Sequence, residues 1–184
     1  MHVRVREIWL VRHGATEWSS TGRHTGRTDI PLSPEGEQQA AGLAPRIDRP
    51  WSQVLSSPLL RARRTAELAG LAPEIDDGLV EWDYGPAEGL TTAELSAEQP
   101  WSVWGDVELG ETLQQVADRC ADVLTRLPLD GDVCLVAHGH LLRILAAVYL
   151  GLEPVKAKHL VLRPGGIAVL GREHDYPAVL GWNL

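Results

Sequence analysis

Two histidine–glycine pairs, each at the end of an apolar run, are the residues of this chain best suited to chemistry. Arg12, His13 and Gly14 follow the run 8–11, and His138 with Gly139 follow the run 133–137. Short apolar runs of this kind predict buried strands, and open α/β sheets hold ligands at the carboxyl ends of their strands. An imidazole beside a guanidinium there indicates a nucleophile or base that acts on an anion. One such pair would suit a strand that merely meets a polar loop, whereas two predict imidazoles that converge on one crevice.

Arg61 and Glu81 could join the two histidines. Arg61 is expected one turn into a helix that begins just after a strand, and helix N-termini attract anions. On that helix Arg63 is expected to point into solvent, while Arg64 shares the face of Arg61. Glu81 follows another apolar pair, so its carboxyl group could project into the crevice or lie on a surface loop. The sequence thus offers a second cation and an acid for the same site.

These residue types form the minimum set for phosphoryl transfer through a phosphohistidine, with no metal ion and no cofactor. The reaction needs fixed cations around the phosphoryl oxygens, because positioning and electrostatics carry most of the catalysis. The attacking imidazole must be neutral, and adjacent guanidinium groups disfavour its protonation. The candidate nucleophile and its surrounding groups are His13, Arg12, Arg61 and His138, and the candidate acid is Glu81.

The elements that must position these residues alternate between strand and helix. Strands are expected at 7–11, 54–55, 133–137, 166–171 and 178–183, with a further short strand within 74–80. Helices are expected at 33–47, 58–71, 111–127 and 141–150, with a small one within 91–110 and a polar loop at 14–33. Ser33 as N-cap and Pro34 at the first helical position begin the first helix. This alternation predicts an α/β fold with a mixed, mostly parallel sheet covered on both faces.

Length and composition indicate one domain over residues 1–184. The 44% hydrophobic and 23% charged residues are ordinary for a globular protein. A net charge of −8 argues against nucleic-acid binding, which usually needs a basic face. No apolar run approaches the ~18 residues of a membrane span and the N-terminus lacks a signal-peptide core, so a cytoplasmic protein without membrane contact is expected.

Five segments in this order resemble the histidine phosphatase superfamily, also called the phosphoglycerate mutase-like family. They are LVRHGATEW, TGRHTGRTDIPLSPEGEQQA, SSPLLRARRTAEL, EWDYGPAEGLT and VAHGH, and they span nearly the whole chain. A single RHG is a weak signal, whereas five collinear motifs are specific. The resemblance implies a three-layer α/β/α sandwich.

The resemblance also implies roles for the matching residues. His13 would be the phosphorylated nucleophile and Glu81 the proton donor, while the phosphate pocket would comprise Arg12, Arg61 and His138. Further substrate contacts are expected from Thr16, Ser19, Thr25, Gly26 and Gly139. Ser19 stands where many members have an asparagine, which would remove or shorten one phosphate contact. His140 has no assigned role in the resemblance, and packing at the start of a helix is expected for it.

The leading functional hypothesis is a phosphomonoesterase that hydrolyses a small phosphorylated metabolite, such as a sugar phosphate or bisphosphate. The alternative is a bisphosphoglycerate-dependent phosphoglycerate mutase, which shares the catalytic set. A mutase must keep water from its phosphoenzyme, and the short segment between Gly89 and Glu111 favours a site open to water. A non-catalytic phosphate binder would be expected to lack His13, Arg12 or Glu81. A metal site at His138 and His140 lacks any accompanying ligand motif.

The sequence leaves the substrate and the oligomeric state open. The two C-terminal strands could end the sheet or pair with another chain, so a homodimer stays open. Trp101 and Trp104 could line the mouth of the site, pack beneath it or form a dimer patch, with core packing as the default.

Overall fold

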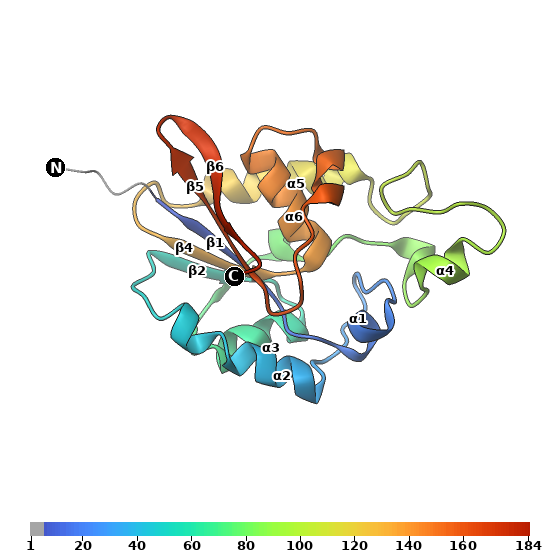
Figure 1. Cartoon of the computed structure of the whole chain (residues 1–184), viewed down its shortest axis with the longest axis horizontal. Coiled ribbons are helices and arrows are strands. Elements are labelled where there is room, and N and C mark those ends of the chain that lie inside the picture. The colour runs from blue at the N-terminus through green and yellow to red at the C-terminus, as the bar shows by residue number, and fades with distance from the viewer. Residues whose placement is uncertain (1–5) are drawn as a thin grey trace.

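The computed structural model describes residues 6–184, in which a six-stranded sheet lies between two layers of helices (Figure 1). The strand order is β3-β2-β4-β1-β5-β6; the four strands β1 to β4 pair in parallel, and β5 and β6 pair antiparallel. The strands are β1 Ile8–Arg12, β2 Gln53–Ser56, β3 Glu74–Ile75, β4 Val133–Ala137, β5 Ile167–Glu173 and β6 Tyr176–Trp182. The predicted three-layer sandwich with a mixed, mostly parallel sheet is confirmed.

Helices cover both faces of the sheet because the strands are apolar on both sides. The α-helices are α1 Glu17–Thr21, α2 Pro34–Ala41, α3 Leu60–Leu68, α4 Thr92–Leu95, α5 Leu113–Arg126 and α6 Gly139–Tyr149. Short 3₁₀ helices lie at Ala44–Arg46 (η1), Asp77–Leu79 (η2), Gly85–Ala87 (η3) and Pro154–His159 (η4). One core joins the sheet to α5 and α6, and the other joins it to α2 and α3, so β4 is buried along its whole length.

The register of the two central strands places the two histidine–glycine pairs side by side. Arg12 of β1 lies opposite Ala137 of β4, and the His13 N–H donates to the Ala137 carbonyl over 3.0 Å. Because the two strands are parallel, His13 and His138 follow them at the same edge of the sheet. The sheet therefore brings the two imidazoles together at its carboxyl edge, as the sequence predicts.

Several element boundaries differ from those predicted, each for a local reason. The polar loop expected at 14–33 contains the short helix α1, whose capping box joins Thr16 to Ser19, so the prediction is wrong for residues 17–21. The helix capped by Ser33 ends at Ala41 rather than near 47, because Gly42 follows and Pro45 lies in a separate 3₁₀ turn. The helix expected from 58 begins at Leu60, and the strand expected within 74–80 is only two residues long.

Two glycines far apart in the sequence fix the start of the loop after β1. A Cβ built on Gly14 would lie 2.2 Å from the Gly36 carbonyl oxygen, and one on Gly36 would lie 1.9 Å from the Ala15 carbonyl oxygen. Neither distance leaves room for a side chain, so the loop packs directly against the first turn of α2. The Gly14 N–H also donates to Thr65 Oγ1 of α3 over 3.1 Å. Two helices thereby hold the segment that carries His13.

Within residues 6–184, no helix is both long and apolar enough to cross a membrane.

Candidate active site

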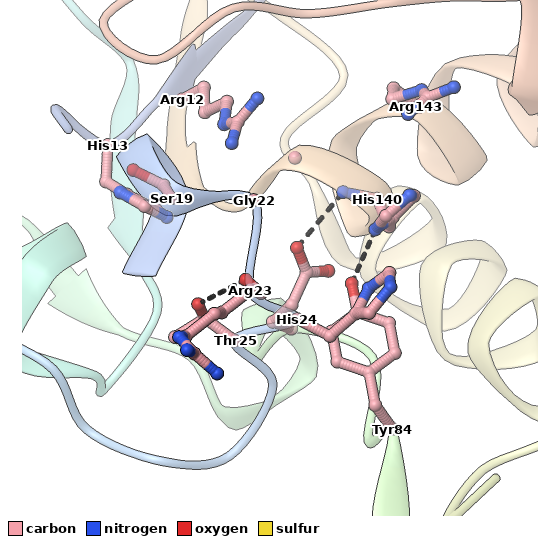
Figure 2. Close-up of a pocket in the computed structure, with 12 residues that line it drawn as sticks. Arg12, His13, Ser19, Gly22, Arg23, His24, Thr25, Tyr84, His140 and Arg143 are labelled. Atoms are coloured by element: carbon pink, nitrogen blue, oxygen red, sulfur yellow. Dashed lines mark hydrogen bonds between the residues drawn. The ribbon is translucent and has the colours of Figure 1, made fainter. Parts of the chain in front are cut away.

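A pocket opens at the carboxyl edge of the sheet, and Figure 2 shows the side chains that line it. Six of the residues predicted for the site are on its wall: Arg12, His13, Ser19, Thr25, Glu81 and Gly139. The other four, Thr16, Gly26, Arg61 and His138, are buried next to these residues. The structure thus brings all ten predicted residues into one region, with six on the pocket wall and four buried.

His13 is buried with only 4% of its surface exposed, and its two ring nitrogens have different surroundings. Nδ1 lies 2.7 Å from the Gly14 carbonyl oxygen, which can only accept, so Nδ1 carries the hydrogen. Nε2 is then the nitrogen with the free lone pair. Burial, and then the positive charges of Arg61 and Arg12, lower the pKa of His13 well below its ordinary value. The imidazole is therefore neutral at physiological pH, as the predicted nucleophile requires.

Arg12 presents its guanidinium group against the second glycine motif. Its Nη1 donates to the Leu162 carbonyl over 2.6 Å, while its buried Nε has no hydrogen-bond partner among residues 6–184. A Cβ on Gly139 would lie 3.0 Å from Arg12 Cζ, so the absence of a side chain there makes room for the guanidinium. Nη2 of this partly exposed side chain makes no hydrogen bond among residues 6–184, so it is available to an anion in the pocket.

Arg61 and His138 form a fully buried pair directly behind His13. Arg61 Nε donates to His138 Nδ1 over 3.2 Å, and His138 Nε2 lies 2.7 Å from Ser57 Oγ. The His138 and His13 rings meet edge to face with centroids 5.1 Å apart. The remaining Arg61 donors bind the carbonyls of Thr25, Gly26 and Thr28.

All three nitrogens of Arg61 therefore donate to the protein, through four of its five N–H groups, and one N–H of Nη1 makes no hydrogen bond among residues 6–184. Arg63 is exposed, as expected, and Arg64 forms surface ion pairs with Glu37 and Glu67.

Glu81 is held by the N-terminus of α6. His138, the N-cap of this helix, makes no capping bond with its side chain, so the first N–H groups of the helix need another acceptor. The His140 N–H donates to Glu81 Oε2 over 3.0 Å, and the Leu141 N–H donates to Oε1 over 2.8 Å. The Trp82 N–H also donates to Oε1, over 2.9 Å. Of the two positions that the sequence left open, Glu81 takes the one in the pocket wall, and three backbone bonds fix its carboxyl group there.

The predicted substrate contacts near α1 have structural partners of their own. Thr16 Oγ1 accepts from the Ser19 N–H over 3.1 Å, and Ser19 Oγ accepts from the Thr16 N–H over 2.8 Å. Thr25 and Gly26 offer their carbonyls to Arg61. A Cβ on Gly26 would meet the Trp82 carbonyl at 2.5 Å, which explains the glycine. Of these four residues, Ser19 and Thr25 also line the pocket.

The pocket has further lining residues that the sequence did not predict. They are Gly22, Arg23, His24, Tyr84, His140 and Arg143. The Tyr84 hydroxyl hydrogen-bonds to His140 Nδ1. His140 and Arg143 are three residues apart on α6 and so share a face of it, which is a signal that helical periodicity could have provided. His140 thus lines the pocket as well as packing at the helix start.

The two tryptophans whose place the sequence left open pack behind pocket residues. Trp101 contacts His24 with ring centroids 5.0 Å apart, and Trp104 contacts His140 with centroids 5.1 Å apart. Both rings are partly buried against the hydrophobic core. They therefore support the imidazoles from beneath, in agreement with the expected core packing.

Residues 8–184 match the family model of the histidine phosphatase superfamily (branch 1). The match covers nearly the whole chain and includes each of the pocket segments described above. The chain belongs to the histidine phosphatase superfamily. The predicted family is confirmed.

Relatives of this superfamily member include several named phosphatases. The acid phosphatase of Mycobacterium tuberculosis is 39% identical, with 98% of this chain and 95% of the relative covered. The sedoheptulose 1,7-bisphosphatase of Saccharomyces cerevisiae is 36% identical, with 78% of this chain and 67% of the relative covered. A solved structure of an open reading frame product from Mycobacterium tuberculosis superposes with a TM-score of 0.89 at 33% identity and covers 97% of each chain. These similarities support a hydrolase acting on small phosphorylated metabolites and give less support to a mutase.

Among residues 6–184, no group of three or more His, Cys, Asp or Glu side chains is placed to hold a metal ion. His138 and His140, which are separated by one residue, have different partners: Arg61 and Ser57 for the first, and Tyr84 for the second. The two imidazoles are therefore engaged separately.

Proposed function

We propose that this chain is a single-domain phosphomonoesterase in which His13 is the nucleophile and Glu81 the proton donor. The observation that carries the proposal is the tautomer of His13: a buried, neutral imidazole whose Nε2 is free, beside a guanidinium with an unpartnered N–H. A neutral nucleophile next to fixed cations is what the attack on a phosphate ester requires. The matched superfamily and the named relatives support the reaction class.

In the first step, the lone pair of His13 Nε2 forms a bond to phosphorus while the bond from phosphorus to the ester oxygen breaks. The phosphoryl oxygens accept hydrogen bonds from Arg12, whose side chain is partly exposed and whose Nη2 makes no hydrogen bond among residues 6–184. The leaving alkoxide takes a proton from Glu81. Glu81 Oε2 accepts one backbone N–H, so this oxygen retains the capacity to carry that proton. The products are an alcohol and a phosphohistidine.

In the second step, water attacks the phosphorus atom and the bond from phosphorus to His13 Nε2 breaks. Glu81, now a carboxylate, takes a proton from the attacking water, as the reverse of its first role. Orthophosphate leaves, and both His13 and Glu81 return to their starting states. The Gly14 carbonyl keeps Nδ1 protonated throughout, which preserves the orientation of the ring.

Hydrolysis is favoured over phosphoryl transfer to a second metabolite because the pocket has access to water. Arg12, Ser19, Arg23 and Arg143 on its wall are all partly exposed. A mutase must exclude water to avoid losing its phosphoenzyme. The predicted cytoplasmic location and the homodimer left open by the sequence stay predictions.

The test is phosphate release from aryl, sugar and glycerate phosphates by the wild type and by His13→Ala, with and without EDTA. The wild type should release phosphate in the presence of the chelator, and acid quenching should trap a phosphoenzyme. His13→Ala should lose on the order of 10⁴-fold or more in turnover, because no other group supplies the covalent bond. His159→Ala, which removes an exposed imidazole on η4, serves as the control and should keep full activity.

Two results would contradict this proposal. Near wild-type turnover by His13→Ala would remove His13 from the covalent step. Negligible phosphate release combined with isomerisation of 3-phosphoglycerate, once 2,3-bisphosphoglycerate is added, would make the protein a mutase.

A further inference from the structure

The pocket carries more positive charge than a single phosphoryl group requires. Three arginines, Arg12, Arg23 and Arg143, line it against one carboxylate, that of Glu81. The whole chain, in contrast, has a net charge of −8. A local excess of arginines over carboxylates in an acidic protein indicates that the pocket wall binds an anion.

Arg143 lies across the pocket from the proposed nucleophile. Figure 2 shows His13 at one side of the pocket and Arg143, from α6, at the other, with Arg12 between them. A phosphoryl group bonded to His13 Nε2 and held by Arg12 would therefore lie across the pocket from Arg143. Any contact between Arg143 and the substrate must therefore involve a part of the substrate other than this phosphoryl group.

The Arg143 guanidinium is held rigidly. Nε donates to the Ala157 carbonyl over 3.1 Å, and Nη2 donates to the Lys158 carbonyl over 2.9 Å, both on η4. The Trp104 ring lies beneath it, with Cζ 5.0 Å from the ring centroid. Within residues 6–184, Nη1 makes no hydrogen bond. The group is therefore oriented in advance, with one nitrogen available to a ligand.

The charge of Arg143 is not neutralised by an acidic partner within residues 6–184, unlike that of its neighbours on the pocket rim. Arg23 pairs with Glu94 at 3.5 Å, and Arg27, beside the pocket, pairs with Glu111 at 3.1 Å. Arg143 bonds only to carbonyl groups, and it is half-buried. Burial lowers its pKa, and the nearby positive charge of Arg12 lowers it further. An anion bound at Arg143 would offset both effects through its opposite charge.

We propose that Arg143 binds a second anionic group of the substrate, a phosphate or a carboxylate, at the end of the pocket away from His13. This inference rests on the proposed phosphomonoesterase function and narrows its substrates to molecules with at least two acidic groups. A monophosphate without a second anion leaves Arg143 unpaired and is a poorer substrate.

The test compares matched substrates that differ by one acidic group. Fructose 1,6-bisphosphate is paired with fructose 6-phosphate, and 3-phosphoglycerate with glycerol 3-phosphate, so that the two pairs report a phosphate and a carboxylate separately. The wild type should favour the doubly acidic member of at least one pair by about tenfold or more in kcat/KM. Arg143→Gln should reduce that preference by about 10- to 100-fold, since a hydrogen bond to a charged group has about this value.

Two further variants complete the design. Arg172→Gln removes a cation from the exposed β5–β6 hairpin and should leave the preference unchanged, which controls for net charge. Arg143→Lys retains the charge without the planar fork and should keep part of the preference. It also provides a folded alternative if loss of the bonds to η4 prevents Arg143→Gln from folding.

Equal kcat/KM values for both members of both pairs in the wild type would overturn the inference while leaving the phosphatase intact. An unchanged preference in folded Arg143→Gln would overturn it as well. Calorimetric binding of the same compounds to His13→Ala separates the two proposals. Preferential, Arg143-dependent binding of the doubly acidic compounds without any hydrolysis by the wild type would support the anion site and reject the phosphomonoesterase.

Discussion

At the level of single residues, the hydrogen bonds that side chains already make within the protein decide which of their polar atoms can contact a substrate. His13 has one ring nitrogen committed to the Gly14 carbonyl, which leaves Nε2 as the reactive atom. Arg61 and His138, in contrast, have all their polar atoms engaged with each other, with Ser57 and with three carbonyl groups. Nε2 of His13 therefore has a free lone pair, whereas each polar side-chain atom of Arg61 and His138 already has a partner in the protein.

Glu81→Gln tests the proton donor through the leaving group. The amide oxygen can replace Oε1 and keep the bonds from the Trp82 and Leu141 N–H groups, while the bond from the His140 N–H is lost. The fold should be retained, but the side chain cannot deliver a proton. Hydrolysis of alkyl phosphates, whose alkoxide must be protonated, should fall by about 10²- to 10⁴-fold. Hydrolysis of p-nitrophenyl phosphate should fall by about tenfold or less, since nitrophenolate leaves without a proton. Equal losses on both substrates would assign Glu81 a positioning role.

At the level of elements, the loop after β1 is held by close backbone packing against α2. Gly14 and Gly36 approach each other without room for a side chain, and Ser33 accepts the Gly36 N–H over 3.1 Å while capping α2. The position of His13 therefore depends on a helix that begins 21 residues later in the chain, at Pro34. The SPEG sequence of Ser33–Gly36 predicts the cap, but it does not indicate that the glycine touches the catalytic loop.

Gly36→Ala should destabilise the protein by about 1–3 kcal/mol, because its Cβ would overlap the Ala15 carbonyl and force backbone movement. Activity should fall as well, since the displaced loop carries His13. Gly42→Ala, at the other end of α2, is the matched control: its Cβ would lie 3.4 Å from the nearest oxygens, and its φ is −67°. This variant should be neutral or slightly stabilising. Urea denaturation of both variants measures the difference, and similar free energies of unfolding would contradict the packing argument.

At the level of the whole molecule, two buried neutral histidines link stability to pH. Burial and the neighbouring arginine charges lower the pKa of His13 and of His138 well below their ordinary values. In the unfolded chain both histidines titrate at about 6.5. As the pH falls below that value, the unfolded state takes up protons that the native state does not bind, so the native state loses stability.

Between pH 7.5 and 5.5, the free energy of unfolding should fall by up to about 1.4 kcal/mol for each of these two histidines. Urea denaturation at the two pH values measures the loss in a range above the ordinary pKa of carboxyl groups. His138→Gln should reduce the dependence on pH, whereas His159→Gln, at an exposed position on η4, should leave it unchanged. A free energy of unfolding that is constant over this range would show that the native histidines titrate normally.

The sequence alone determined the sheet, the family and the convergence of His13 with His138, because these follow from short local patterns. An apolar run predicts a strand, and two parallel strands that end in the same motif must place it at one edge. The tertiary structure alone decided which polar atoms remain free. Arg61 meets His138 across 77 residues of sequence, and Arg23, His24 and Arg143 reach the pocket from two separate segments. Such contacts depend on how helices and loops pack on the sheet, and no local pattern contains that information.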